Sequence, residues 1–118
     1  MNIESLREYC LFKKGVEETL PFDDDTLVYK VMGKGFAYMS ITDNDRITLK
    51  CDPERSQQLR AEHAAIKPGY HMNKQHWNTV YYNEIPYTLC LQLIDHSYDL
   101  VVSGLTRKLR LELENLPK

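Results

Sequence analysis

The sequence predicts an α+β fold, an antiparallel sheet of about five strands with helices packed on one face. Two observations support this class. Short segments rich in β-branched and aromatic residues are joined by brief turns, as antiparallel strands are. Other segments carry apolar residues three and four positions apart, as helices with one buried face do. The expected order is helix, three strands, helix, two strands and helix, followed by a C-terminal helix.

The first predicted helix begins at Asn2, whose side chain can cap it, and ends near Gly15. Ile3, Leu6 and Cys10 recur near the helical period, so they should face the core. Residues 17–25 contain a proline and end in three aspartates, a composition typical of a loop.

Three strands are predicted next, over residues 27–31, 36–41 and 46–51. The turns between them are short enough for antiparallel hairpins. In the third strand Ile47 and Leu49 share one face, while Thr48 and Lys50 share the other. One side of the sheet should therefore be open to water.

A second helix should begin at Asp52 and Pro53, which suit the N-cap and first helical positions, and run to about residue 63 or 64. Residues 66–68 can form a brief edge strand, where the missing amide of Pro68 costs little. Residues 77–82 form a better strand, and residues 69–75 link the two as a long loop or wing.

The last strong helix opens at Pro86 and can end or bend at Gly104. It carries a wide apolar stripe made of Tyr87, Cys90, Leu91, Ile94, Tyr98 and Val101. Leucines at near-helical spacing in residues 105–118 predict a final amphipathic helix that packs on the body or on a partner.

The length and composition predict one domain over residues 1–118. The polar start does not resemble a signal peptide, and no apolar run approaches the roughly 20 residues of a membrane span. We therefore expect a soluble, cytoplasmic protein. Cys10, Cys51 and Cys90 are odd in number and widely spaced, so we expect free buried thiols and neither a metal nor another cofactor.

Charge is unevenly distributed along the chain, although the net charge is only −2. Residues 1–25 balance to −4, residues 26–80 to +3 and residues 81–118 to −1. Any site for a polyanion should therefore lie in the middle segment. Five lysines could form one basic surface there: Lys30, Lys34, Lys50, Lys67 and Lys74.

No acidic residue lies between Glu62 and Glu84, and this window holds the only tryptophan, Trp77. Cations, amides and aromatics clustered here suit a polyanion or a planar base. Trp77 could equally be a core anchor between sheet and helix, and Asn78 could hold a turn. Metal binding or acid–base catalysis by the window's two histidines is disfavoured because no carboxylate lies near them in the sequence.

The segment from Pro68 to Val80 resembles the signature of the MmcQ/YjbR-like family of small bacterial proteins. Further pieces match in order and spacing over roughly residues 10–104: Phe22, Val28–Val31 with Gly33 and Lys34, Lys50–Pro53, and Asp95–Tyr98. The resemblance implies a CyaY-like or secretion-chaperone-like fold and DNA binding by two hairpin wings. Residues 105–118 match no motif of the family, so this helical extension could be particular to this chain.

We expect a non-enzymatic protein that binds double-stranded DNA weakly and in a salt-sensitive way, as a monomer. The implied wings are the turn near Gly33 or the turn at residues 42–45, together with the loop at residues 70–75. Asp43 and Asp45 would repel phosphate, which disfavours the second turn. The expected DNA contacts are Lys34, Lys67, Tyr70, His71, Lys74, His76, Trp77 and Asn78.

The alternative is a protein-interaction module that holds a partner segment on the sheet or against the C-terminal helix. An enzyme ranks last, because no carboxylate pair, activated nucleophile or phosphate-cradling loop is visible in the sequence.

Overall fold

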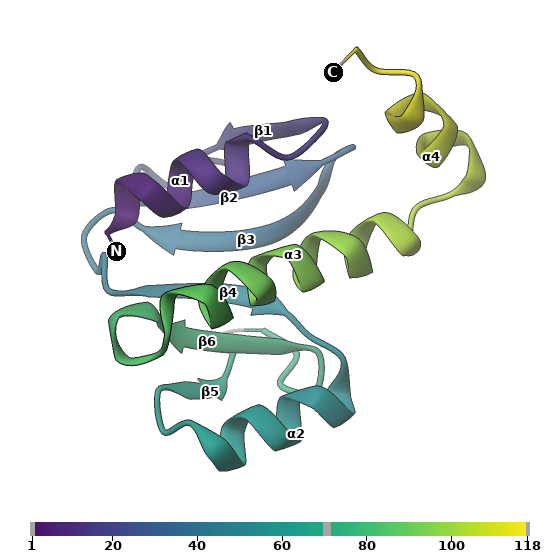
Figure 1. Cartoon of the computed structure of the whole chain (residues 1–118). Coiled ribbons are helices and arrows are strands. Elements are labelled where there is room, and N and C mark those ends of the chain that lie inside the picture. The colour runs from purple at the N-terminus through teal and green to yellow at the C-terminus, as the bar shows by residue number, and fades with distance from the viewer. Residues whose placement is uncertain (1, 70–71, 118) are drawn as a thin grey trace.

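The computed structural model describes residues 2–69 and 72–117. Its helices are α1 (Ile3–Leu11), α2 (Pro53–Glu62), α3 (Tyr87–Ser103) and α4 (Arg107–Glu114), with a short 3-10 helix η1 (Tyr82–Glu84) before α3. Its strands are β1 (Val16–Thr19), β2 (Thr26–Val31), β3 (Lys34–Ser40), β4 (Arg46–Lys50), β5 (Ile66–Pro68) and β6 (Trp77–Tyr81). The strands form one antiparallel sheet in the order β1-β2-β3-β4-β6-β5 (Figure 1). The predicted α+β class is confirmed.

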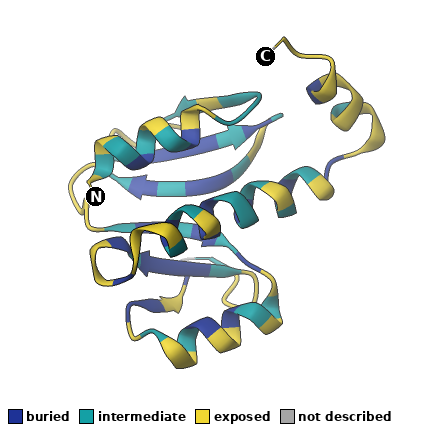
Figure 2. Ribbon diagram, viewed as in Figure 1, coloured by how far each residue is buried: buried dark blue, intermediate teal, exposed yellow. Residues whose placement is uncertain are grey.

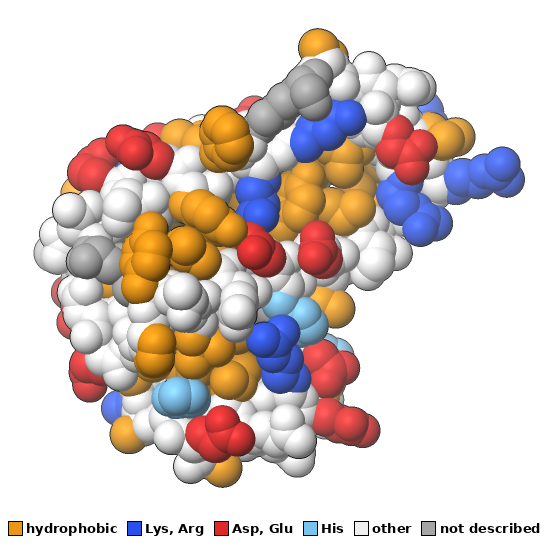
Figure 3. All heavy atoms as spheres, in the orientation of Figure 1, with side chains coloured by type: hydrophobic (Ala, Val, Ile, Leu, Met, Phe, Trp, Pro, Cys, Tyr) orange, Lys and Arg blue, Asp and Glu red, His pale blue; other side chains and the backbone are white. Residues whose placement is uncertain are grey.

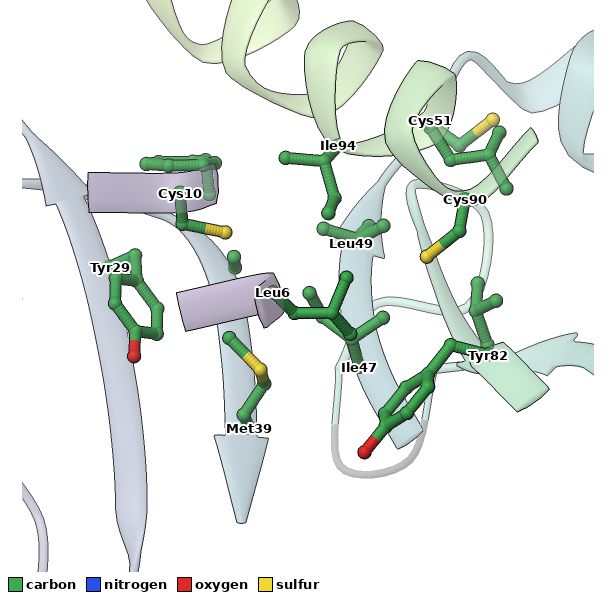
Figure 4. Close-up of a cluster of buried hydrophobic side chains, with 14 of the residues drawn as sticks. Leu6, Cys10, Tyr29, Met39, Ile47, Leu49, Cys51, Tyr82, Cys90 and Ile94 are labelled. Carbon is green, nitrogen blue, oxygen red and sulfur yellow. The ribbon is translucent and has the colours of Figure 1, made fainter. Parts of the chain in front are cut away.

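Helices cover one face of this sheet (Figure 1), and the core lies between the two layers. The buried stripe of α3 crosses the middle strands, and the buried positions alternate along β4, where Ile47 and Leu49 face the helices (Figures 2 and 4). The helix starts follow the predicted chemistry. Asn2 caps α1, and the side chain of Asp52 accepts a hydrogen bond from the N–H of Arg55 at the start of α2.

The sheet has one strand more than expected, because residues 16–19 form β1 and the loop predicted over this stretch is wrong. Val16 pairs with Val31 and Thr19 with Val28, which places β1 at the edge of the sheet. Glu18 is held by the guanidinium of Arg7 on α1 at 2.9 Å and by the hydroxyl of Tyr29 on β2. These long-range contacts order a segment that has little apolar character of its own.

No helix in the described part of the chain covers the opposite face of the sheet, as predicted. Arg46, Thr48 and Lys50 of β4 are cross-strand partners of Tyr81, Thr79 and Trp77 of β6, so all six side chains share this face. On β3, Tyr38 is opposite Thr48 and joins them. We call this surface the open face.

Helix α4 packs back on the body beside Gly15, which joins α1 to β1. Leu113 of α4 is buried, and the ammonium of Lys14 donates to the backbone carbonyl of Glu114 at 2.9 Å. Gly15 has a φ of +73°, and a Cβ built on it would lie 2.5 Å from Cδ1 of Leu113. The predicted amphipathic helix therefore docks on its own chain, and a glycine makes room for it.

Gly15→Ala should lower the free energy of unfolding by about 1 to 2 kcal/mol, because a left-handed backbone strains any residue with a Cβ. Chemical denaturation would measure this loss. Gly104→Ala is the matched control, since its φ is −87° and its added Cβ would meet nothing closer than 3.6 Å. Equal losses in the two variants would contradict the role given to Gly15.

Candidate nucleic-acid interface

Three segments of the predicted site meet at one end of the sheet. The turn between β2 and β3, the end of β4 and the start of β6 lie together there, at the right of Figure 1. Lys34, Lys50 and Trp77 line a hollow of about 210 Å³ at this end, together with Gly35, Val101 and Gly104. None of these described lining residues is acidic. We call this the basic end of the sheet.

Lys74 and His76 are exposed in the segment that leads into β6 at the basic end. This segment is tied to α2 by Arg60, whose guanidinium donates to the backbone carbonyls of Lys74 and Trp77. The predicted contacts at Tyr70 and His71 lie outside the described residues. Sequence reasoning missed Arg60 as a support of this segment.

Asn78 does not belong with the predicted DNA contacts, because its side chain is only 2% exposed. It lies on the helix-covered face, where its carbonyl oxygen accepts from Nε of Arg60 at 2.7 Å and its amide donates to Ser56 at 3.1 Å. The alternative prediction, that Asn78 has a structural role, agrees with these contacts. Its side chain, however, bonds to residues of α2 and not to its own turn.

Trp77 is half-buried on the open face, so it does not fill the space between sheet and last helix. Its ring packs edge-on against Tyr38, with the ring centroids 5.5 Å apart. Lys67 also lies on the open face, but it stands over the ring of Tyr81 at 5.4 Å and does not line the hollow at the basic end. Apart from the buried Asn78, the described residues of the predicted site thus divide between the basic end and the open face.

The far end of the sheet is acidic. The connections at residues 20–25 and 41–45 meet there, and Asp25 links them by accepting hydrogen bonds from Ser40 and Thr42. Asp43 and Asp45 belong to the same end, where Asp45 pairs with Arg46 at 2.8 Å. The turn at residues 42–45 therefore lies at the opposite end of the sheet from Lys34, and only the Gly33 turn shares an end with Lys74.

The Asp95–Tyr98 segment of α3 anchors the helix to the rest of the fold. Asp95 pairs with Lys13 at 2.6 Å and accepts a hydrogen bond from the hydroxyl of Tyr9 at 2.7 Å. The hydroxyl of Tyr98 donates to the carbonyl of Lys14 at 2.6 Å. Ser97 is fully buried and bonds both β3 and β4.

His96 accepts a hydrogen bond at Nε2 from the N–H of Asp52, the cap of α2. Burial lowers the pKa of His96, and the charge of Arg55 lowers it further, whereas Asp52 and Asp99 oppose the shift. The neutral imidazole therefore stabilises the fold above the ordinary histidine pKa of about 6.5, and this contribution is lost as the pH falls.

Stability should decline more steeply between about pH 7.5 and pH 5.5 in the natural protein than in His96→Gln, whose side chain does not titrate. Denaturation curves at several pH values would measure both slopes. The opposite order of slopes, or equal slopes, would contradict the role of a neutral His96.

The three cysteines are free and buried, as predicted. Burial raises the pKa of Cys10 and of Cys90 to about 12, so these thiols stay protonated at neutral pH. Within residues 2–69 and 72–117, no three His, Cys, Asp or Glu side chains are grouped closely enough to hold a metal ion. No helix in the described ranges is long and apolar enough to cross a bilayer.

The chain matches known proteins over most of its length, including the segments described above. The YjbR family model matches residues 11–100. The chain belongs to the YjbR family. The YjbR protein of Escherichia coli strain K12 is 34% identical over 112 residues, which make up 93% of this chain and 95% of that protein. YbdF of Escherichia coli O157:H7 is 39% identical over 107 residues, 89% of this chain and 88% of that protein.

Solved structures share the fold seen in this member of the YjbR family. The crystal structure of Deinococcus radiodurans protein DR2400, with a domain named DUF419, has a TM-score of 0.89 and 43% identity, covering 98% of this chain and 88% of that one. A Pseudomonas syringae protein has a TM-score of 0.72 and 28% identity, covering 85% of this chain and 98% of that one. The match to DR2400 is long enough to include α4, so this helix is not particular to the present chain.

Proposed function

We propose that this YjbR-family protein binds double-stranded DNA without catalysing a reaction, and that the basic end of the sheet is the contact surface. Lysine ammonium groups neutralise phosphates whatever the base sequence, which gives weak and salt-sensitive binding. The turn after β2 and the segment before β6 act as the two wings, and Arg60 holds the second wing in place.

One observation carries the proposal: Lys34 and Lys50 line the same hollow as Trp77, although the three residues come from three different strands. The acidic connections lie at the other end of the sheet, which supports an approach of the polyanion to the basic end alone. Lys74 adds an exposed cation in the second wing.

The double variant Lys34→Ala/Lys50→Ala should bind duplex DNA about tenfold more weakly. The negative slope of log affinity against log salt concentration should become shallower by about 2, one for each lost phosphate contact. Fluorescence anisotropy with a labelled duplex at several salt concentrations would measure both effects.

Lys108→Ala/Arg110→Ala removes the same charge from exposed positions on α4 and serves as the matched control. A folded Lys34/Lys50 variant that binds as tightly as the natural protein, or a control that loses as much affinity, would overturn this contact surface.

A second candidate function is binding of a protein segment, favoured by large apolar side chains beside the sheet. Phe22 is 72% exposed, and Leu20 and Ile41 are also exposed. On the C-terminal helix, Leu113 is buried against its own chain and is not available to a partner, whereas Leu111 is exposed, as are other hydrophobic side chains on the helical side of the molecule (Figure 3). This candidate predicts association with a protein that is insensitive to salt and little binding of DNA.

A further inference from the structure

The open face holds a second and larger hollow, of about 810 Å³. Its floor includes Tyr38, Thr48, Thr79 and Tyr81, and Phe22 forms part of its wall. The two threonine hydroxyls lie 3.1 Å apart and can bond to each other or to a ligand. This volume lies within the range of small-molecule sites, and the lining combines aromatic and apolar side chains with polar and charged ones, which suits a ligand that carries both rings and charged groups.

Two cations stand over the ring of Tyr81 within this hollow. The guanidinium carbon of Arg46 lies 5.1 Å from the ring centroid, and Nζ of Lys67 lies 5.4 Å from it. Arg46 belongs to β4 and Lys67 to β5, the strands on either side of β6. Positive charge beside a partly exposed aromatic floor complements a ligand that combines planar rings with phosphates.

The aromatic floor continues toward the basic end. Tyr38 packs edge-on against Trp77, which lies beside Lys50 and Lys34 in the smaller hollow. A chain of nucleotides could therefore pass from Lys67 to Lys34 and keep an aromatic ring or an ammonium group within reach along its path. If the two hollows bound two separate ligands, the rings and cations between them would not need to form one continuous path.

We propose that the open face binds unpaired bases of single-stranded DNA that continues from a duplex held at the basic end. Bases stack on aromatic side chains whatever their sequence, while ammonium and guanidinium groups follow the phosphates. The inference extends the proposed function, and it rests on that function for the position of the duplex.

Acidic residues limit how the strand can lie. Asp23 and Asp43 line the same hollow at the acidic end of the sheet. The carboxylate of Asp23 accepts hydrogen bonds from the N–H groups of Asp25 and Thr26. The negative charges of Asp23 and Asp43 would repel the phosphates of a bound strand. The phosphates must therefore run on the side of Lys67 and Lys50, with the bases toward Tyr38 and Tyr81.

A labelled duplex and the same duplex with a single-stranded thymidine extension of about ten nucleotides, a length within the range of known single-strand sites, would test this inference. The extension should tighten binding by about tenfold or more. Tyr81→Leu should abolish this gain and leave binding of the blunt duplex unchanged. Tyr87→Leu is the matched control, because Tyr87 is exposed on α3 in the helical layer.

Two further measurements keep the test independent of folding defects. Lys67→Gln changes an exposed side chain and should reduce the gain from the extension, while thermal unfolding should be unaltered. Stacking near Trp77, the only tryptophan of the chain, should quench its fluorescence more strongly with the extended DNA than with the blunt duplex.

The outcomes separate the two proposals. Duplex binding with no gain from the extension, or with a gain that survives both Tyr81→Leu and Lys67→Gln, overturns the open-face site and leaves the proposed function standing. Binding of the single strand that needs Tyr81, without any duplex binding, overturns the proposed function and supports the open-face site. Absence of binding to every probe overturns both.

Discussion

Ser97→Ala should lower the free energy of unfolding by about 3 kcal/mol. The Ser97 hydroxyl donates to the carbonyl of Phe36 on β3 at 2.6 Å and accepts from the N–H of Lys50 on β4 at 2.9 Å. Ser97 is fully buried, so alanine would leave a donor and an acceptor without a partner and without water. Urea denaturation would measure the loss.

Ser103→Ala is the control for this prediction. Ser103 lies on the same helix, but it is exposed and its hydroxyl only donates to the carbonyl of Leu100 within the helix. Its replacement should change the free energy of unfolding by less than about 0.5 kcal/mol. A loss at Ser97 no larger than the loss at Ser103 would show that the hydroxyl does not join α3 to the sheet.

Arg60→Ala should cost about 2 kcal/mol of stability and should also weaken duplex binding. Arg60 supplies donors to the side chain of Asn78 at 2.7 Å and to the carbonyl of Trp77 at 3.2 Å, and it also bonds the carbonyl of Lys74. Without it the segment before β6 loses its tie to α2, so Lys74 is no longer held at the basic end with Lys34 and Lys50. Thermal unfolding and anisotropy titration on the same samples would measure the two effects.

Arg60→Lys separates charge from geometry, because lysine keeps the cation and loses the planar fork that reaches several acceptors. We expect it to behave much like Arg60→Ala. Arg110→Ala, at an exposed position on α4, controls for the loss of an arginine elsewhere. If Arg60→Lys kept full stability and full duplex binding, the planar guanidinium fork would not be what holds the segment before β6.

Much of the fold could be predicted because its signals are local. Alternation along β4 identified the buried pair Ile47 and Leu49 and the open face opposite them. The residue types at Asp52 and Pro53 identified the start of α2. Strand β1 could not be predicted in this way, since Val16–Thr19 is ordered by pairing with β2 and by the contacts of Glu18 with Arg7 and Tyr29.

The candidate site was only partly predictable for the same reason. The lysines and Trp77 were visible in the sequence, but the pairing of β4 with β6 decides which of them meet. Asn78 is next to Trp77 in sequence and points to the other layer, because successive residues of a strand alternate faces. Tyr38, Tyr81 and Arg46 were missed, although alternation along β6 and β4 is the signal that could have found them.

The two outer strands of the sheet also bear on how the protein behaves at high concentration. Unpaired edges of a sheet invite other chains to add to it and so promote aggregation. Here β1 is only four residues long and β5 only three, and β5 ends in Pro68, which has no N–H to offer. Both borders are therefore poor templates for intermolecular strand addition, which should help to keep copies of the protein apart.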